Sequence, residues 1–247
     1  MRYFIELSYD GSPFVGWQRQ PKGDSVQSCL EDALKTLLQK PISVVGAGRT
    51  DAGVHARQLF AHVDLDDQVD QNLKFRLNKL LPKEVAVNSI LAVRDDAHAR
   101  FDATGRRYSY HITTQKDPFL KKRSYYFSKT LDIELMNQAA TDMLDHDDFK
   151  CFSKSRTDVK TYLCDIQEAY WEQNGSDLVF FIQANRFLRN MVRAIVGTLI
   201  EVGLKKISID DFKSILLSRD RSKAGYSVPA HGLYLEKVYY PKHIFAV

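Results

Sequence analysis

The stretch VVGAGRTDAGVHARQ, residues 44–58, decides between two folds for this chain of 247 residues. A short apolar run leads into glycines at 46 and 48, which is how the phosphate-binding turn of a dinucleotide-binding domain begins. Asp51 occupies the place of that motif's third glycine, where a carboxylate would repel a pyrophosphate. The loop is followed by a strand pattern, Leu59–Leu65, and not by a helix. The stretch therefore predicts a glycine loop between two strands and argues against a nucleotide-dependent oxidoreductase.

The segments around this loop complete a β-α-β-β-α-β pattern. Alternating runs predict strands, and apolar residues at three- and four-residue spacing predict helices. The expected strands are Arg2–Tyr9, Ile42–Val45, Leu59–Leu65 and Val85–Val93, and the expected helices are Val26–Leu38 and Leu73–Leu81. Ser25 or Asp24 can cap the first helix, and Pro41 ends it. This order is that of the ferredoxin-like fold.

The rest of the chain shows the same order, although no repeat is visible in its sequence. The expected strands are 104–113, Tyr162–Trp171, Leu178–Ala184 and Leu233–Tyr240, and the expected helices are Ile133–Leu144, Phe187–Val202 and Ile209–Leu217. We therefore expect an α/β (α+β) fold of two related ferredoxin-like halves with largely antiparallel sheets. The boundary is expected in RDDAHAR, residues 94–100, which gives an N-terminal half at 1–98 and a C-terminal half at 99–247.

The composition narrows the classes of protein. It is 44% hydrophobic and 27% charged, as in an ordinary globular chain, and the net charge of +4 permits a nucleic-acid partner without requiring one. Three scattered cysteines without a CxxC pair, and histidines without an HExxH motif, argue against a disulfide framework and a metal site and suit a reducing cytoplasm. No secretory signal is apparent, and the longest apolar run is too short and too charged to span a membrane.

Asp51 is the first candidate for chemistry. It lies between Gly48 and Gly53, so a tight bend can present it, and Arg49 and His55 are close in sequence. Cations beside a carboxylate favour its ionised form, which suits nucleophilic or electrostatic work. The alternative is a loop aspartate that only accepts backbone hydrogen bonds.

The second candidate is the strand FDATGRRYSYHI, residues 101–112. Arg106, Tyr108 and Tyr110 share one face of it, and residues 107, 109 and 111 share the other. Tyrosines on a strand commonly pack the sheet, but tyrosine beside arginine also stacks RNA bases and holds their phosphates. The sequence leaves both interpretations open.

The third candidate is NRFLRNMVRAIVG, residues 185–197. Arg186, Arg189 and Arg193 are expected to form a cationic stripe on a buried helix, with Gly197 allowing another element to pack closely. A buried arginine needs an anionic partner, and Asp51 is the obvious one. The segment FKCFSKSRTDVK adds a possible surface for an RNA backbone, with basic residues Lys150, Lys154, Arg156 and Lys160.

Together these features resemble the tRNA pseudouridine synthase A family. The resemblance runs through most of the chain, and GRTDAGVHA is its most specific motif. YDGSPFVGWQRQ, SVQSCLEDAL, FDATGRRYSY, NRFLRNMVRAIVGTLIEVG and HGLYLEKVYY follow in the family's order. The loop FSKSRTDVKTYLCDI is shorter than in familiar members, which affects the RNA contacts expected there.

The resemblance implies an isomerase that converts uridine to pseudouridine in the anticodon stem-loop of tRNA, at positions 38, 39 and 40 of the tRNA. It implies a homodimer without metal or cofactor, in which two related halves flank a basic active-site cleft. The family's nucleophile falls on Asp51, its base-stacking tyrosine on Tyr108 and its aspartate-pairing arginine on Arg193; Arg49 and His55 are expected to hold RNA or order the loop. The remaining alternative is a non-catalytic RNA-binding protein with the same fold.

Overall fold

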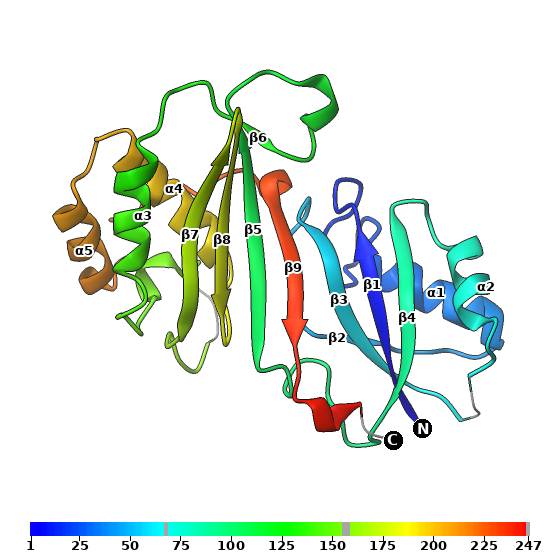
Figure 1. Cartoon of the computed structure of the whole chain (residues 1–247). Helices are drawn as coiled ribbons and strands as arrows, with labels where there is room; N and C mark the ends of the chain where they lie inside the picture. The colour runs from blue at the N-terminus through cyan, green and yellow to red at the C-terminus, as the bar shows by residue number, and fades with distance from the viewer. Residues whose placement is uncertain (67–68, 155–158, 246–247) are drawn as a thin grey trace. The chain divides into compact units, whose positions relative to one another are not determined.

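The computed structural model describes residues 1–66, 69–154 and 159–245, and it divides into two compact units. Unit 1 comprises residues 1–104 and 234–247, and unit 2 comprises residues 105–233. The fold is mixed α/β, with five α-helices in the part of the chain described and strands that are mostly antiparallel (Figure 1). This confirms the predicted mixed α/β class with largely antiparallel strands, whereas the two related ferredoxin-like halves remain a prediction. The predicted functional halves at 1–98 and 99–247 remain a separate prediction.

Unit 1 begins with the predicted β-α-β-β-α-β order. Its elements are β1 (Arg2–Tyr9), α1 (Val26–Leu38), β2 (Val45–Gly46), β3 (His55–Asp64), α2 (Leu73–Leu80) and β4 (Val85–Val93), followed much later by β9 (Leu233–Tyr239) and the short 3-10 helix η4 (Lys242–Ile244). β1 lies between β4 and β3, antiparallel to both. β3 also pairs with β2 in antiparallel fashion and with the start of β9 in parallel.

Local sequence explains α1 well. The Ser25 side chain accepts a hydrogen bond from Ser28 N, and Ser25 N donates one to the Ser28 side chain. This capping box satisfies backbone donors at the helix start. Val26, Leu30 and Leu34 on the predicted apolar face are fully buried. The helix ends at Leu38, before Pro41, as predicted. β2 differs from the prediction, because only Val45–Gly46 pairs with β3 and residues 42–44 lie outside any strand.

Unit 2 contains three antiparallel strands in the order β5-β8-β7 and three helices. Its main elements are β5 (Gly105–Thr113), α3 (Ile133–Thr141), β7 (Ile166–Asn174), β8 (Asp177–Ala184), α4 (Met191–Gly203) and α5 (Ile209–Ser218); β6 (Tyr125–Tyr126) and three 3-10 turns, η1 (Pro118–Leu120), η2 (Lys150–Phe152) and η3 (Ala230–Gly232), complete it. β7 starts later than predicted, because Leu163 and Cys164 pair with Asp148 and Asp147 instead of joining the sheet. α3 packs against both β7 and α4.

The start of α4 corrects the sequence-based prediction. Met191 is its first residue, so Arg186 and Arg189 lie in the preceding segment and the predicted cationic stripe is wrong. The helix starts late for two reasons, the backbone conformation of Asn190 and a hydrogen bond from a distant segment. Asn190 has φ 66°, outside the helical region, and the Arg189 carbonyl accepts a hydrogen bond from Lys154 N at 3.0 Å. The prediction that this helix is buried nearly all round is confirmed, since 11 of its 13 residues are buried.

Candidate active site

Asp51 stands at the head of a tight turn in unit 1. Val54 N donates to the Asp51 carbonyl at 3.1 Å, and Gly53, the third residue of this four-residue turn, has φ 79°. A positive φ at that position is the requirement of a type II turn, which glycine meets without strain. The Asp51 side chain is partly exposed, whereas Thr50 and Val54 around it are buried. The turn thus presents a carboxylate from a backbone that is fixed on both sides.

The segment YDGSPFVGW, residues 9–17, holds this turn in place, and we call it the clamp. Tyr9 Oη lies 2.9 Å from Thr50 Oγ1, and Trp17 N donates to the Thr50 carbonyl at 3.2 Å. Two clamp glycines allow the backbones to meet. A Cβ on Gly11 would lie 1.9 Å from the Val54 carbonyl oxygen, and one on Gly16 would lie 2.5 Å from the Thr50 carbonyl oxygen.

Sequence reasoning assigned the clamp only to a turn-rich loop and to a family motif, and so missed its role. The signal was present, because two glycines and three aromatic side chains within nine residues indicate close backbone packing. Trp17 is buried, and a Cβ added to Gly46 would lie 2.5 Å from atoms of the Trp17 ring. The partners of Gly11 and Gly16, however, are Val54 and Thr50, which lie 43 and 34 residues away along the chain, and no local pattern specifies them.

His55 closes the turn at the first residue of β3. It is 2% exposed, and its Nδ1 accepts a hydrogen bond from Gly11 N at 3.1 Å and lies 3.2 Å from Asp10 Oδ1. Its ring stacks on Tyr234 of β9, with centroids 4.5 Å apart. Burial and these contacts support ordering of the loop, the second of the two roles expected for His55.

Arg49 and Gly48 form the open side of the same loop. Arg49 is exposed, next to the buried Thr50. A Cβ on Gly48 would meet no atom within 4 Å, and its φ is not in the left-handed region. Gly46 therefore allows the close approach of Trp17 and Gly53 supplies the positive φ of the turn, but neither reason applies to Gly48. Arg49 is thus placed to reach solvent or a bound molecule.

The structure of unit 2 distinguishes the roles of Tyr108 and Tyr110, which the sequence left open. Tyr110 is fully buried, its hydroxyl donates to the Pro229 carbonyl at 2.8 Å, and burial raises the pKa of its phenol. It is a packing residue. Tyr108, two residues earlier on β5, is partly exposed and meets Phe187 edge to face, with centroids 5.1 Å apart. Of the two tyrosines, Tyr108 is therefore the one that is not buried.

Arg193 occupies the first turn of α4 and is partly exposed, less buried than the sequence predicted. Its Nε donates to the Val228 carbonyl at 2.7 Å, while Val228 N donates to the Arg193 carbonyl at 3.2 Å. This reciprocal pair fixes the direction of the guanidinium group. Because an arginine fork recognises carboxylates and phosphates through oriented N–H groups, a fixed direction matters for its role.

The segment 221–229 lies along α4 and supports Arg193. The predicted close packing at Gly197 is confirmed, because a Cβ there would lie 1.8 Å from the Tyr226 carbonyl oxygen. Gly225 N donates to Thr198 Oγ1 at 2.9 Å, and Asn190 Nδ2 donates to Ser227 Oγ at 2.6 Å. Two separate parts of the sequence thus cooperate to hold one guanidinium.

The structure gathers the five candidate residues into two groups. Arg49, Asp51 and His55 belong to the clamped turn of unit 1, and Tyr108 and Arg193 belong to unit 2. Arg156 of the predicted basic surface lies outside the described residues. Within residues 1–66, 69–154 and 159–245, no group of three or more histidine, cysteine, aspartate or glutamate side chains could hold a metal ion. No described helix combines the length and hydropathy needed to cross a membrane.

Comparison with known proteins identifies the class. A family model described as tRNA pseudouridine synthase matches residues 7–102 and 139–241, which include Arg49, Asp51, His55 and Arg193 but not Tyr108. The class is therefore that of the tRNA pseudouridine synthases, which are isomerases.

Individual relatives narrow this further. The tRNA pseudouridine synthase A of Parabacteroides distasonis is 52% identical over 248 residues, covering 100% of this chain and 98% of that protein. The protein of the same name from Bacteroides fragilis is 52% identical over 99% of this chain and 98% of its own, and that from Bacillus subtilis is 40% identical over 97% and 99%. The chain belongs to the tRNA pseudouridine synthase A family.

Proposed function

We propose that this chain isomerises uridine to pseudouridine in the anticodon stem-loop of tRNA, at positions 38, 39 and 40, with Asp51 as the nucleophile. The observation that carries the proposal is the clamped turn, in which a partly exposed carboxylate stands between buried residues on a backbone fixed by contacts from residues 9–17. A group fixed in this way does not have to be ordered when the substrate binds, which lowers the barrier to reaction.

The reaction defines what the site must do. The N1–C1′ bond of uridine breaks, the uracil turns, and a C5–C1′ bond forms, while the proton on C5 leaves. Substrate and product have the same atoms and oxidation state, so the reaction requires no redox cofactor. Asp51 can attack C6 of the uracil or C1′ of the ribose, and both attacks give a covalent adduct that resolves to product.

The other candidate residues support this step. A paired base cannot reach an active site and must leave its stack, and an aromatic ring can replace the lost stacking. We assign that role to Tyr108, which is partly exposed. We likewise assign to Arg193 the pairing with Asp51, to Arg49 a contact with RNA from the open side of the loop, and to His55 the ordering of the turn from within.

The same proposal covers the arrangement of the protein. Two related ferredoxin-like halves flank a basic cleft that receives the anticodon arm, and the enzyme acts as a homodimer in the cytoplasm. Its partner is tRNA. These statements rest on the family to which the chain belongs and on the exposed arginine and tyrosine described above.

The first experiment measures pseudouridine in an unmodified tRNA transcript, mapped nucleotide by nucleotide. Wild type should modify the anticodon arm, whereas Asp51→Asn and Asp51→Ala should show no turnover and should still bind tRNA. Substantial turnover by either variant would remove Asp51 from the mechanism. Binding by all three proteins without turnover by wild type would leave the non-catalytic RNA-binding alternative.

A second experiment tests Arg193 with two substitutions. Arg193→Lys keeps the positive charge but loses the Nε donor to Val228, and Arg193→Met loses both. We expect kcat to fall by about tenfold for lysine and by more than a hundredfold for methionine, because only an oriented cation supports the carboxylate. Equal activity of the methionine variant and wild type would contradict the pairing.

A further inference from the structure

The connection between β5 and α3 in unit 2 has a surface that the proposed chemistry does not use. We call residues 116–129, KDPFLKKRSYYFSK, the basic arm. It carries five cationic residues and one acidic residue, a net charge of +4. The whole chain has a net charge of +4, so the charges of all other residues cancel. The excess positive charge of the protein therefore equals that of this one segment.

The basic arm is a folded element. Asp117 Oδ1 accepts a hydrogen bond from Phe119 N at 2.8 Å and so caps η1, and Arg123 N and Ser124 N donate to the Leu120 carbonyl at 2.9 and 3.0 Å. β6 then pairs in parallel with the end of β5 at Ile112 and Thr113. These contacts hold the arm against the strand that carries Tyr108.

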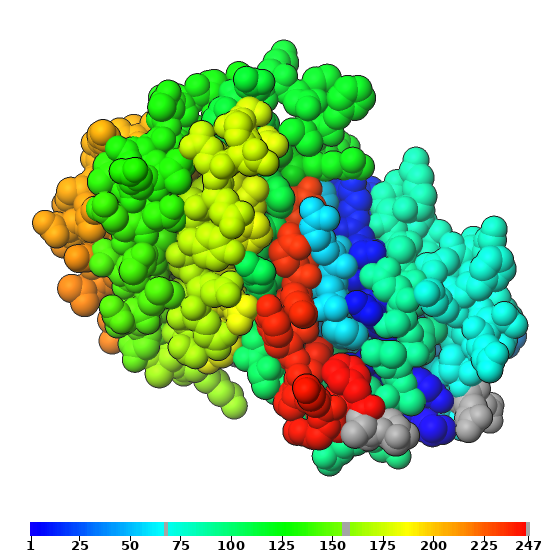
Figure 2. Space-filling view, in the orientation of Figure 1, coloured from blue at the N-terminus to red at the C-terminus, as the bar shows by residue number. Residues whose placement is uncertain are grey.

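The cationic residues of the arm are exposed to solvent. All five cationic residues are exposed: Lys116, Lys121, Lys122, Arg123 and Lys129. Phe119 is 86% exposed, the highest value among the large hydrophobic side chains that the structure describes, and Tyr126 is 49% exposed. Burying a phenylalanine would stabilise the fold, so its exposure among cations indicates a partner instead of packing. Figure 2 shows residues of this part of the chain at the surface, in green at the top of the view.

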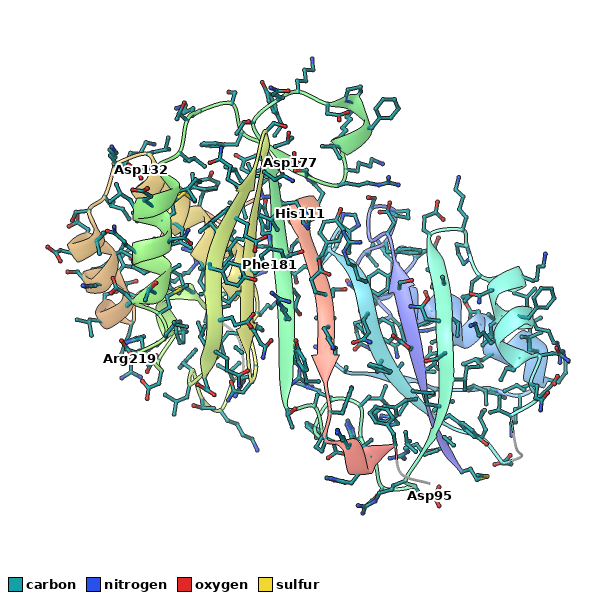
Figure 3. The ribbon with its side chains drawn as sticks, in the orientation of Figure 1. Asp95, His111, Asp132, Asp177, Phe181 and Arg219 are labelled. Carbon is teal, nitrogen blue, oxygen red and sulfur yellow. The ribbon has the colours of Figure 1, made fainter. Side chains whose placement is uncertain are left out.

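The arm begins beyond the end of β5, several residues along that strand from Tyr108. Thr113 and Asp177 are paired at the turn end of the β7–β8 hairpin, where the chain leaves β5 toward the arm. Figure 3 labels Asp177 at this end and His111 a short way along β5 from it. Five residues of strand separate Tyr108 from Thr113, which is about 17 Å at about 3.4 Å per residue.

From these observations we propose that the basic arm is a second RNA-contact surface, which binds the sugar-phosphate backbone of the substrate at the far end of β5 from the base at Tyr108. Exposed lysines and arginine neutralise phosphates, and an exposed aromatic ring stacks on a base or ribose; the two together are the signature of a nucleic-acid surface. The proposal rests on the proposed function, because it takes tRNA as the substrate and Tyr108 as the residue that meets the target base.

The test compares two variants with the same loss of charge. Lys121→Gln/Lys122→Gln/Arg123→Gln removes three exposed cations from the arm. The control, Lys74→Gln/Lys79→Gln/Lys83→Gln, removes three exposed cations from α2 and the residues after it in unit 1. Each is assayed for binding of an unmodified tRNA transcript at several salt concentrations, and for pseudouridine formation at limiting and saturating tRNA.

The arm variant should bind tRNA about tenfold or more weakly at physiological salt, and the slope of log K against log salt should decrease by about 2 to 3, since each phosphate contact contributes 0.7 to 0.9. Its kcat at saturating tRNA should equal that of wild type. The control should match wild type in both measurements. Phe119→Ala should weaken binding by about tenfold while leaving the salt slope unchanged, because stacking releases no counterions.

The outcomes separate this proposal from the proposed function. If wild type modifies tRNA and the arm variant binds it like the control, the arm is not an RNA surface and the proposed function stands. If the arm variant loses kcat at saturating tRNA, the arm belongs to the active site and the remote contact is refuted. If its sedimentation differs from that of wild type while its salt slope does not, the arm binds a second copy of the chain. If wild type modifies no tRNA, the proposed function itself fails.

Discussion

Gly11→Ala should reduce turnover about a hundredfold while the protein stays folded. A Cβ at residue 11 would lie 1.9 Å from the Val54 carbonyl oxygen and 2.5 Å from its carbon. Real Cβ atoms essentially never come within 3.0 Å of such atoms, so one of the two backbones must move by about 1 Å. Val54 is the last residue of the Asp51 turn, and a displacement of about 1 Å at reacting groups can cost about 10²-fold in rate.

The assay is pseudouridine formation at saturating tRNA, accompanied by urea unfolding. We expect kcat to fall about a hundredfold and the free energy of unfolding to fall by about 1–3 kcal/mol. Gly175→Ala is the control: its φ of 59° strains any other residue by about 1–2 kcal/mol, but nothing lies within 4 Å of its Cβ, so its kcat should not change. Should Gly11→Ala not fold, Tyr9→Phe tests the clamp more mildly, because it removes only the hydroxyl that lies 2.9 Å from Thr50 Oγ1. A folded Gly11→Ala protein with wild-type turnover would refute the clamp.

The other predictions concern stability and reactivity. Burial, followed by nearby positive charge, lowers the pKa of His62 to about 4, and the His62 Nδ1 accepts a hydrogen bond from Ala99 N at 3.1 Å. In the unfolded chain the imidazole binds a proton from about pH 6.5 downward. The free energy of unfolding should therefore be at its full value above about pH 6.5 and should fall by up to about 3 kcal/mol as the pH drops to about 4. Chemical denaturation across this range should show the loss, and His62→Asn, which keeps an acceptor, should show less of it. Gly197→Ala should lower the free energy of unfolding by about 2 kcal/mol and Tm by about 6 °C, because a Cβ would lie 1.8 Å from the Tyr226 carbonyl oxygen; an unchanged Tm would contradict that packing. Burial raises the pKa of the Cys151 thiol to about 12, so mass spectrometry after iodoacetamide treatment of the folded protein at pH 8 should find it unmodified.

Elements whose causes are local followed from the sequence. β1 and β4 have the predicted bounds, because apolar and polar side chains alternate over eight or nine residues, so only one face of each strand can pack on a core. α1 has the predicted bounds, because its capping serine, its apolar face and the proline that follows it all lie within or next to the helix in the sequence. The glycine loop between two strands was likewise correctly distinguished from a nucleotide-binding turn.

Elements whose causes are distant did not follow from it. The start of α4 depends on a hydrogen bond from Lys154 to the Arg189 carbonyl, and β7 starts late because Cys164 pairs with Asp147. β9 pairs in parallel with β3, a partner far away in the chain that no local pattern specified. In each case a backbone group had two possible partners, and packing between segments far apart in the chain decided which one it took.

The same division applies to the candidate site. The sequence by itself determined which residue types could carry the chemistry, since the ionised state of an aspartate, the stacking of a tyrosine and the charge of an arginine are intrinsic to those side chains. Only the tertiary structure decided that Tyr110 is buried while Tyr108 keeps an exposed surface, that His55 lies inside the loop, and that residues 9–17 hold the turn of Asp51. Exposure and backbone support arise from contacts between distant segments, and those contacts exist only once the chain has folded.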